Sequence, residues 1–278
     1  MKQAYLSKLA GLPLKTLLQL EGYKVNLVNE YGQLSEYRGP ADYLDPIKPI
    51  ESEGTIHVDH RIATHADLYM CQLGLWNDAG LFFGDPEKLS PDYPGDVLYN
   101  AVCTRDYYIH LVPGTDEDLV GAMMTWRKLM AATDKTEGTK KSRNNDDEHL
   151  KIVGVSQGYT RCTCLPVDDN SFITSDDGLA KILENQGANV LKISTGHIKL
   201  EGFDYGFIGG CAGHIYVHNN DAGPGTPTLQ RAIVFNGDLS KHPDFWAITD
   251  FIQSRNIHPV YFNSYPLEDI GSILATHL

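Results

Sequence analysis

The chain has 278 residues, of which 42% are hydrophobic, and a formal net charge of −13. Its length fits one large domain or two ordinary ones, and its apolar content is enough for a hydrophobic core. A nucleic-acid-binding protein usually carries a concentrated basic face, and this sequence has none, so we expect no nucleic-acid partner. Because no apolar run approaches the roughly 18 residues of a membrane helix, we also expect no membrane association.

The cysteines and the N-terminal residues predict a cytoplasmic protein. Residues 1–20 have a helical apolar rhythm that Lys8, Pro13 and Lys15 interrupt, which is unlike a signal peptide. The cysteines are odd in number and stand in no secretory context, so we expect reduced thiols rather than disulfides. They are Cys71, Cys103, Cys162, Cys164 and Cys211.

Hydrophobic periodicity in the first half of the chain predicts one helix and a series of short strands. The helix covers residues 6–20 and ends at Gly22. Residues 30–54 are rich in prolines and acids, which favours a long irregular loop. The expected strands are residues 23–28, 55–58, 68–73, 81–83, 97–103 and 107–112, and the last two form a hairpin.

In the second half, the clearest helix covers residues 116–132, where Thr115 or Asp116 can cap the N-terminus. Residues 133–149 are charged and lack apolar periodicity, so we expect a mobile surface loop there. Two more helices are expected at residues 177–186 and 243–255, and a Gly/Pro loop at 219–227. The expected strands are residues 151–155, 163–167, 171–174, 189–193, 215–217, 231–235 and 259–263.

Short stretches of similar character recur five times along the chain. From Cys103 onward they are spaced at intervals that are typical of supersecondary units repeated around a centre. If the units close radially, each stretch points toward the axis and brings polar side chains and thiols there. The stretches are residues 64–71, 99–103, 158–162, 207–211 and 267–272.

The fourth stretch is the richest in glycine. Gly209 and Gly210 precede Cys211, and Gly213 precedes His214. Small residues beside a cysteine allow backbone or ligand to approach it closely. These glycines do not match a dinucleotide fingerprint, because no capped helix follows them, and we expect no cofactor.

Several collinear motifs resemble those of an uncharacterised bacterial family that is assigned to the guanidino-group-modifying-enzyme fold, the pentein propeller. The resemblance covers roughly residues 55–275. It implies an α/β fold in which residues 1–278 form a single pentein-like domain, a five-bladed propeller of ββαβ-type units around a polar axial pocket. The motifs are His65-Ala-Asp-Leu, Cys71-Gln-Leu-Gly, Tyr99-Asn-Ala-Val-Cys, Gln157-Gly-Tyr-Thr-Arg-Cys, Phe172-Ile-Thr-Ser-Asp and Asp204-Tyr-Gly-Phe-Ile-Gly-Gly-Cys.

Relatives with that fold include arginine and agmatine deiminases, dimethylarginine hydrolases and amidinotransferases. They use a Cys nucleophile, a His, and carboxylates that hold a guanidinium group. In most of them the nucleophile lies near the C-terminus in a Gly-rich His-Cys segment. This chain departs from that pattern, because its last cysteine is Cys211 and its terminal motif offers Ser272.

The leading functional hypothesis is a small-molecule hydrolase or transferase that acts on a guanidino or amidine group through Cys211. Attack by a thiolate requires a general acid or base, which His65 or His214 could supply. In a strand, His65 and Asp67 would face the same side, which suits guanidinium binding with proton transfer. For Cys211 the alternative is a buried thiol in a glycine-rich strand end, and for Asp67 it is a capping residue in a turn.

The remaining candidates are residues expected to bind the substrate. Arg161 gives Cys162 an electropositive neighbour, or binds a substrate carboxylate with two parallel hydrogen bonds. The alternative for this pair is a core thiol beside a surface arginine. Asn100, Gln157 and Asp269 complete the set.

Two rival functions remain open. One is a non-catalytic small-molecule-binding protein that keeps the fold and its pocket. The other is a metal-binding protein in which Cys71, Cys103, Cys162 and Cys211 converge with His65, although no Cys-x-x-Cys pair is present. The favoured prediction is a small-molecule substrate in the axial pocket with no metal, and assembly as a homo-oligomer stays open.

Overall fold

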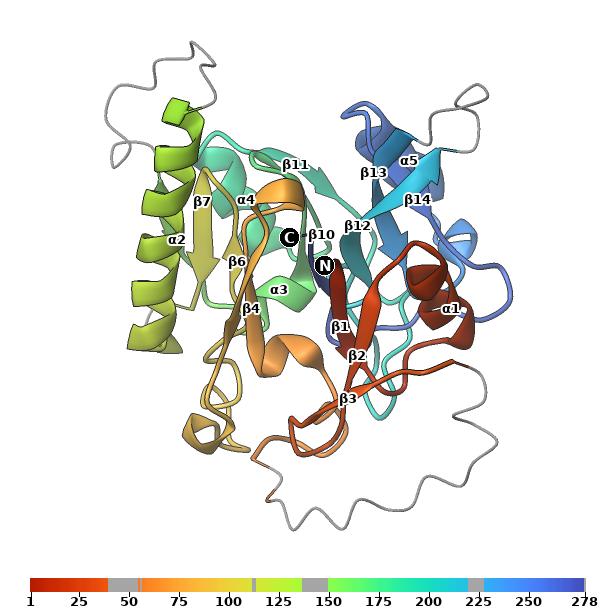
Figure 1. Cartoon of the computed structure of the whole chain (residues 1–278), viewed down its shortest axis with the longest axis horizontal. Helices are drawn as coiled ribbons and strands as arrows, with labels where there is room; N and C mark the ends of the chain where they lie inside the picture. Colours follow the sequence, from red (N-terminus) through yellow and green to blue (C-terminus); the bar gives the residue numbers. More distant parts are fainter. Residues whose placement is uncertain (40–54, 56, 112–113, 137–149, 220–227, 278) are drawn as a thin grey trace.

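The computed structural model describes residues 1–39, 55, 57–111, 114–136, 150–219 and 228–277 (Figure 1). Its described strands form four sheets, and most of them belong to units with one repeated topology. In each unit two antiparallel strands precede a helix, and a third strand then pairs parallel to the second. No helix among the described residues is both long and apolar enough to cross a membrane.

Two of these units follow one another in the middle of the chain. The first contains β6 (Val102–Cys103), β7 (Tyr107–His110), α2 (Glu117–Thr136) and β8 (Lys151–Gly154). The second contains β9 (Cys164–Asp168), β10 (Ser171–Thr174), α4 (Asp177–Asn185) and β11 (Asn189–Lys192). A short helical turn, α3 (Thr160–Thr163), connects the two units and lies near the middle of the molecule in Figure 1.

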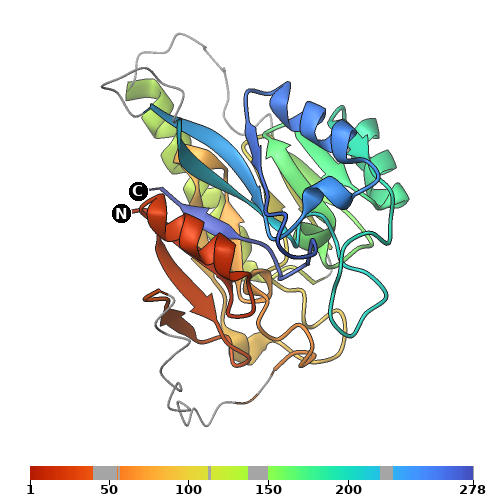
Figure 2. The same cartoon turned by 90° about the vertical axis from the view of Figure 1, so that its right-hand side faces the viewer.

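A third unit contains β12 (Ala212–Asn219), β13 (Thr228–Phe235), α5 (Phe245–Gln253) and β14 (His258–Val260). The fourth is assembled from both ends of the chain: β15 (Leu274–Thr276), β1 (Gln3–Ser7), α1 (Leu12–Leu20) and β2 (Lys24–Val28). Strand β3 (Leu34–Glu36) extends that sheet. The two termini therefore lie side by side, as Figures 1 and 2 show.

Strand β1 replaces the first part of the helix that the sequence predicts at residues 6–20. The helix begins only at Leu12, with Pro13 in its first turn, a position where the missing N–H of proline costs nothing. Residues 3–7 are held as a buried strand between β15 and β2. The prediction was wrong here because half of the pairing comes from residues 274–276, at the other end of the chain.

Strand β4 (Met70–Leu73) pairs antiparallel with β5 (Gly80–Phe83) and joins β6 through a parallel bridge from Leu73 to Cys103. The strand predicted at residues 55–58 is not formed at 55, 57 or 58, and residue 56 lies outside the described residues. Short 3₁₀ turns occur at Ala66–Leu68, Trp76–Asp78, Pro86–Lys88 and Leu239–Lys241.

The other helices and most strands agree with the periodicity of the sequence. Asp116 caps α2, since its Oδ1 accepts a hydrogen bond of 3.1 Å from the Leu119 N–H. The same helix continues to Thr136, so the loop predicted at residues 133–149 begins later than expected, and residues 137–149 lie outside the described part of the chain. Most of the Gly/Pro loop predicted at residues 219–227 lies outside it too.

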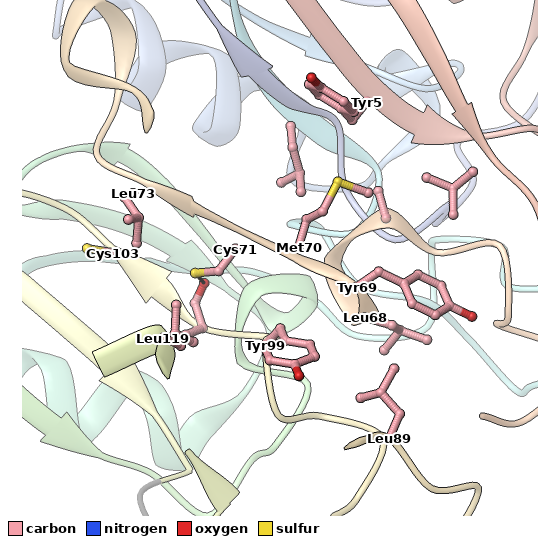
Figure 3. Packing of buried hydrophobic residues seen from close by; sticks show 14 of the residues in the cluster. Tyr5, Leu68, Tyr69, Met70, Cys71, Leu73, Leu89, Tyr99, Cys103 and Leu119 are labelled. Carbon is pink, nitrogen blue, oxygen red and sulfur yellow. Dashed lines mark hydrogen bonds between the residues drawn. The ribbon is translucent and has the colours of Figure 1, made fainter. Parts of the chain in front are cut away.

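The hydrophobic core contains most of the thiols. Figure 3 shows Cys71 and Cys103 packed among apolar side chains that include Leu73 and Leu119. Cys164 is fully buried in a second cluster under α4. Burial raises the pKa of each of these three thiols, which are therefore neutral packing groups near neutral pH.

The five recurring stretches meet in the interior and are hydrogen-bonded in a closed cycle. Each stretch bonds to the next one along the chain, and the last bonds to the first. The bonds run from Asn100 Nδ2 to the Asp67 carbonyl (3.4 Å), Arg161 N to Asn100 Oδ1 (2.7 Å), Gly210 N to the Cys162 carbonyl (3.0 Å), Ser272 N to the Gly210 carbonyl (2.8 Å) and Asp67 N to the Gly271 carbonyl (3.2 Å). This cycle does not by itself establish a five-bladed propeller, which stays a prediction.

Because two histidines are fully buried, we expect the free energy of unfolding to fall in mild acid. Burial lowers the pKa of His110 on β7 to about 4 and that of His214 on β12 to about 3. An unfolded histidine titrates near pH 6.5, so below that pH the unfolded chain binds protons that the folded protein does not. The free energy of unfolding should fall by about 1.4 kcal/mol per pH unit for each histidine.

Urea unfolding at pH 7 and pH 5 measures this effect. We expect the midpoint to decrease in acid, and His110→Phe to reduce the dependence on pH. The exposed His60 supplies the control, because His60→Gln should leave the dependence unchanged. Equal stability at both pH values would contradict the assignment of neutral, buried imidazoles.

Candidate functional site

A pocket of about 310 Å³ opens beside α3 and the segment at residues 200–207. Its walls are mostly apolar or aromatic, and its ionisable side chains apart from two tyrosines are His65, Cys162, Asp204 and Asp269. The lining residues are Ile62, His65, Tyr159, Cys162, Leu200, Phe203, Asp204, Tyr205, Phe207 and Asp269. The volume lies at the lower end of the range for small-molecule sites.

Cys162 is the cysteine that lines this pocket, although its side chain is 3% exposed. Its Sγ donates a hydrogen bond of 3.0 Å to Asp67 Oδ2 and accepts one of 3.5 Å from Asn100 Nδ2. Burial first, and then the charges of Asp67 and Asp269, raise the pKa of the Cys162 thiol well above its ordinary value. The resting group is therefore a neutral thiol whose proton points at a carboxylate.

Asp67 is fully buried and accepts hydrogen bonds from two side chains. Its Oδ2 accepts hydrogen bonds from Cys162 Sγ and, at 2.5 Å, from Ser272 Oγ. Its Oδ1 is buried with no hydrogen-bond partner among the described residues. A buried acceptor that is unpaired is costly, so this oxygen marks a place where a ligand donor would be favourable.

The sequence suggested that His65 and Asp67 lie on a strand, and the structure shows that they do not. His65 is the extended residue before the 3₁₀ turn Ala66–Leu68, and that turn contains Asp67. The turn still brings both side chains close to Cys162, with His65 in the wall of the pocket and Asp67 behind the thiol.

Asp269 is held in the pocket by backbone donors. Its Oδ2 accepts from Phe207 N at 2.9 Å, and its Oδ1 from Gly271 N at 3.0 Å. Burial raises the pKa of the Asp269 carboxyl, and the neighbouring His65 opposes that shift. A Cβ on Gly210 would lie 2.0 Å from Asp269 Oδ1, so the close approach expected of this glycine is used to seat the carboxylate.

Asn100 and Arg161 support the site from behind the pocket wall. Asn100 Oδ1 accepts from the backbone N–H groups of Arg161 and Cys162, which fixes the turn that carries the thiol. Arg161 is 5% exposed and donates to the carbonyls of Gly209 (3.0 Å) and Ala212 (3.2 Å). Neither is among the lining residues, and the guanidinium of Arg161 is engaged by main chain rather than open to a substrate carboxylate.

Gln157 likewise has a local role. Its Oε1 accepts from Tyr159 N at 3.1 Å and shapes the approach to α3. The sequence-based set of substrate-binding residues therefore contributes two side chains to the pocket itself, Cys162 and Asp269.

Cys211 and His214, two of the expected catalytic residues, lie in the core. Cys211 is fully buried in an apolar cluster, and its Sγ donates to the Ile208 carbonyl at 3.2 Å. His214 Nε2 is hydrogen-bonded to the Pro166 carbonyl at 2.7 Å, and its ring packs edge-on against Trp76. Neither lines the pocket, so the structure favours Cys162 over Cys211 as the candidate nucleophile.

The sequence did not predict the aromatic side chains that form one wall of the pocket. Tyr159, Phe203, Tyr205 and Phe207 line the pocket, and three of them come from one short segment beside the glycines. The clustering of aromatic residues immediately before Gly209 was the available signal. Arg61 covers Phe203 from outside, with its guanidinium carbon 4.0 Å from the ring centroid, and also donates to the Gly202 carbonyl.

Residues 76–274 match the model of a protein family of unknown function, DUF6873. This is more than two thirds of the chain. The chain belongs to the DUF6873 family. The matched region contains Cys162 and Asp269, whereas His65 and Asp67 precede it. No curated protein and no solved structure matches the chain.

Proposed function

We propose that this DUF6873 protein acts on a small guanidinium or amidinium compound through a covalent intermediate at Cys162. The observation that carries the proposal is the position of this thiol, in an aromatic pocket with Asp67, Asp269 and His65 around it. A nucleophile, a proton acceptor and an imidazole within reach of one another meet the requirements of nucleophilic catalysis.

The surroundings of the thiol favour a planar cation. Two buried carboxylates, Asp67 and Asp269, lie near Cys162, and aromatic faces attract a cation in a desolvated pocket. The Asp269 carboxylate lines the pocket and suits one N–H of a guanidinium, which donates in a fixed fork, while the charge of Asp67 acts from behind the thiol. None of the described lining residues is Lys or Arg, so we expect the substrate to lack a carboxylate.

The side chains can supply each proton transfer of a hydrolysis. Sγ of Cys162 bonds to the central carbon of the cation while its proton passes to Asp67, and the C–N π electrons move onto nitrogen. The adduct expels an amine, which receives a proton from His65. Water then attacks the same carbon with His65 as base. The C–S bond breaks, Asp67 returns its proton to sulfur to restore the thiol, and the product hydroxyl gives its proton to the released amine. One C–N bond is thereby hydrolysed, and the amine leaves as an ammonium ion.

Two features support the pentein-type propeller as the scaffold. Four units share the same strand and helix order, and the five recurring stretches are hydrogen-bonded in a cycle at the centre. The proposal departs from the related enzymes in its nucleophile. Cys162 belongs to the third stretch, whereas the last stretch contributes Ser272, which donates to Asp67 rather than lining the pocket.

Alkylation with 2-chloroacetamidine tests the proposal, because this reagent is a cation with an electrophilic carbon. We expect one equivalent to react, peptide mass spectrometry to place the adduct on Cys162, and the rate to exceed that of the isosteric neutral chloroacetamide by at least about tenfold. An excess of a simple alkylguanidine should protect the thiol.

The matched control is Cys164→Ser, which removes a fully buried thiol two residues away and should leave the labelling unchanged. Cys162→Ser should abolish it. A slow reaction at all five cysteines with no preference for the amidine would sink the enzymatic proposal. If alkylguanidine protects Cys162 but is never turned over, the protein is a non-catalytic receptor for the same ligands.

A further inference from the structure

We propose that His65, Cys162 and Asp269 form a binding site for a zinc-like divalent cation that opens into the pocket. Each residue offers one ligand atom, and the three atoms lie within 4.8 Å of one another. All three side chains are at least nine-tenths buried. The converging thiols of Cys71, Cys103 and Cys211, which the sequence suggested, take no part, because those groups lie in the core.

The donor set favours zinc over magnesium or calcium. It combines imidazole nitrogen, thiolate sulfur and carboxylate oxygen, whereas Mg²⁺ and Ca²⁺ select oxygen ligands. Ligand atoms around a tetrahedral zinc are separated by about 3.3–3.6 Å, as follows from Zn–N and Zn–S bonds of about 2.0–2.3 Å. Since the three atoms lie within 4.8 Å of one another, binding at this spacing requires the side chains to rotate toward the ion.

Neighbouring groups already orient two of the three ligands. The Asp269 carboxylate is fixed by the N–H groups of Phe207 and Gly271, and Asn100 Nδ2 points at Cys162 Sγ. Such outer partners normally accompany metal ligands and strengthen binding by orienting them.

The charge of the cluster also fits a divalent ion. When ionised, Cys162, Asp67 and Asp269 carry three negative charges against the single positive charge of the buried Arg161. A divalent cation brings the sum to zero, which favours its binding in a buried site. Three protein ligands leave a fourth position facing the pocket, where water or a small ligand can coordinate.

The metal site does not depend on the proposed covalent chemistry. However, Cys162 cannot bind a metal and attack a substrate at the same time. A metal on Cys162 Sγ withdraws electron density from the sulfur and lowers its nucleophilicity toward a substrate carbon. Zinc should therefore protect Cys162 from alkylation by neutral iodoacetamide, and a chelator should restore the reaction.

Cobalt(II) titration of the chelator-treated full-length protein tests the site. We expect one equivalent to bind with a sulfur-to-cobalt charge-transfer band in the near ultraviolet, and zinc to displace it. Cys162→Ser should remove that band. His65→Gln and Asp269→Asn should each weaken binding at least tenfold, while Cys164→Ser should change neither the band nor the affinity.

Three outcomes would overturn the proposal. They are the absence of a sulfur band in the wild type, a band that survives in Cys162→Ser, and equal affinity in all variants, which indicates an adventitious ion only. Circular dichroism of each variant excludes unfolding as the cause, and zinc protection of the wild-type thiol requires no substitution. Cobalt binding and amidine labelling are separate measurements, so either proposal can be contradicted while the other one holds.

Discussion

Asp67→Asn is expected to change the reactivity of Cys162 in opposite directions toward two reagents. Alkylation by chloroacetamidine should slow, because the pocket loses a buried negative charge that attracts the cation. Alkylation by neutral chloroacetamide should become faster at neutral pH, because the charge of Asp67 contributes to raising the pKa of the Cys162 thiol. The ratio of the two second-order rate constants should fall by at least about tenfold.

This ratio is informative because asparagine preserves the shape of the site. Its Oδ1 can still accept from Cys162 Sγ and Ser272 Oγ, so the geometry around the thiol is retained. Measurement requires only the two alkylation rates at one pH.

Asp238→Asn provides the comparison for Asp67→Asn. Asp238 is another buried aspartate, which accepts from Ser240 N at the start of the turn Leu239–Lys241 and does not line the pocket. Its replacement should leave the ratio within about twofold of the wild type. An unchanged ratio in Asp67→Asn would show that this carboxylate does not contribute to the selection of a cation.

Arg161→Met is expected to cost about 3–5 kcal/mol of stability, the usual consequence of removing one partner of a buried charge cluster. The substitution keeps a long side chain but removes a positive charge that interacts favourably with the charge of Asp67. It also leaves the carbonyls of Gly209 and Ala212 without their side-chain donors. The loss is measured as the change in the free energy of unfolding in urea at pH 7.

A double variant separates charge from packing. Arg161→Met combined with Asp67→Asn should recover part of the loss, at least about 1 kcal/mol, because the uncompensated carboxylate is then absent. Arg255→Met is the surface control. Arg255 pairs with Asp168 at 3.2 Å in a partly exposed position, and such pairs contribute about 1 kcal/mol or less. Equal effects at Arg161 and Arg255 would contradict a buried charge cluster.

The sequence alone determined those helices, turns and close approaches whose signals lie within a few neighbouring residues. Asp116 predicted the start of α2, and the hydrophobic pattern predicted the strands at residues 163–167 and 171–174, which are β9 and β10. The glycines around Cys211 predicted a close approach, which Gly210 makes to Asp269. Each of these signals works over a few residues, because caps, turns and the absence of a Cβ act on neighbouring atoms.

The tertiary structure decided which thiol meets the pocket. Cys162 and Cys211 are both buried and each is the last residue of a recurring stretch, so local sequence cannot separate them. They differ in their hydrogen-bond partners. Cys162 Sγ donates to Asp67, which is 95 residues away in the chain, whereas Cys211 Sγ donates to the Ile208 carbonyl three residues away. The same reasoning applies to β1, which is a strand because β15 lies beside it. Burial and charge at a site are sums over long-range contacts, so only the folded chain fixes them.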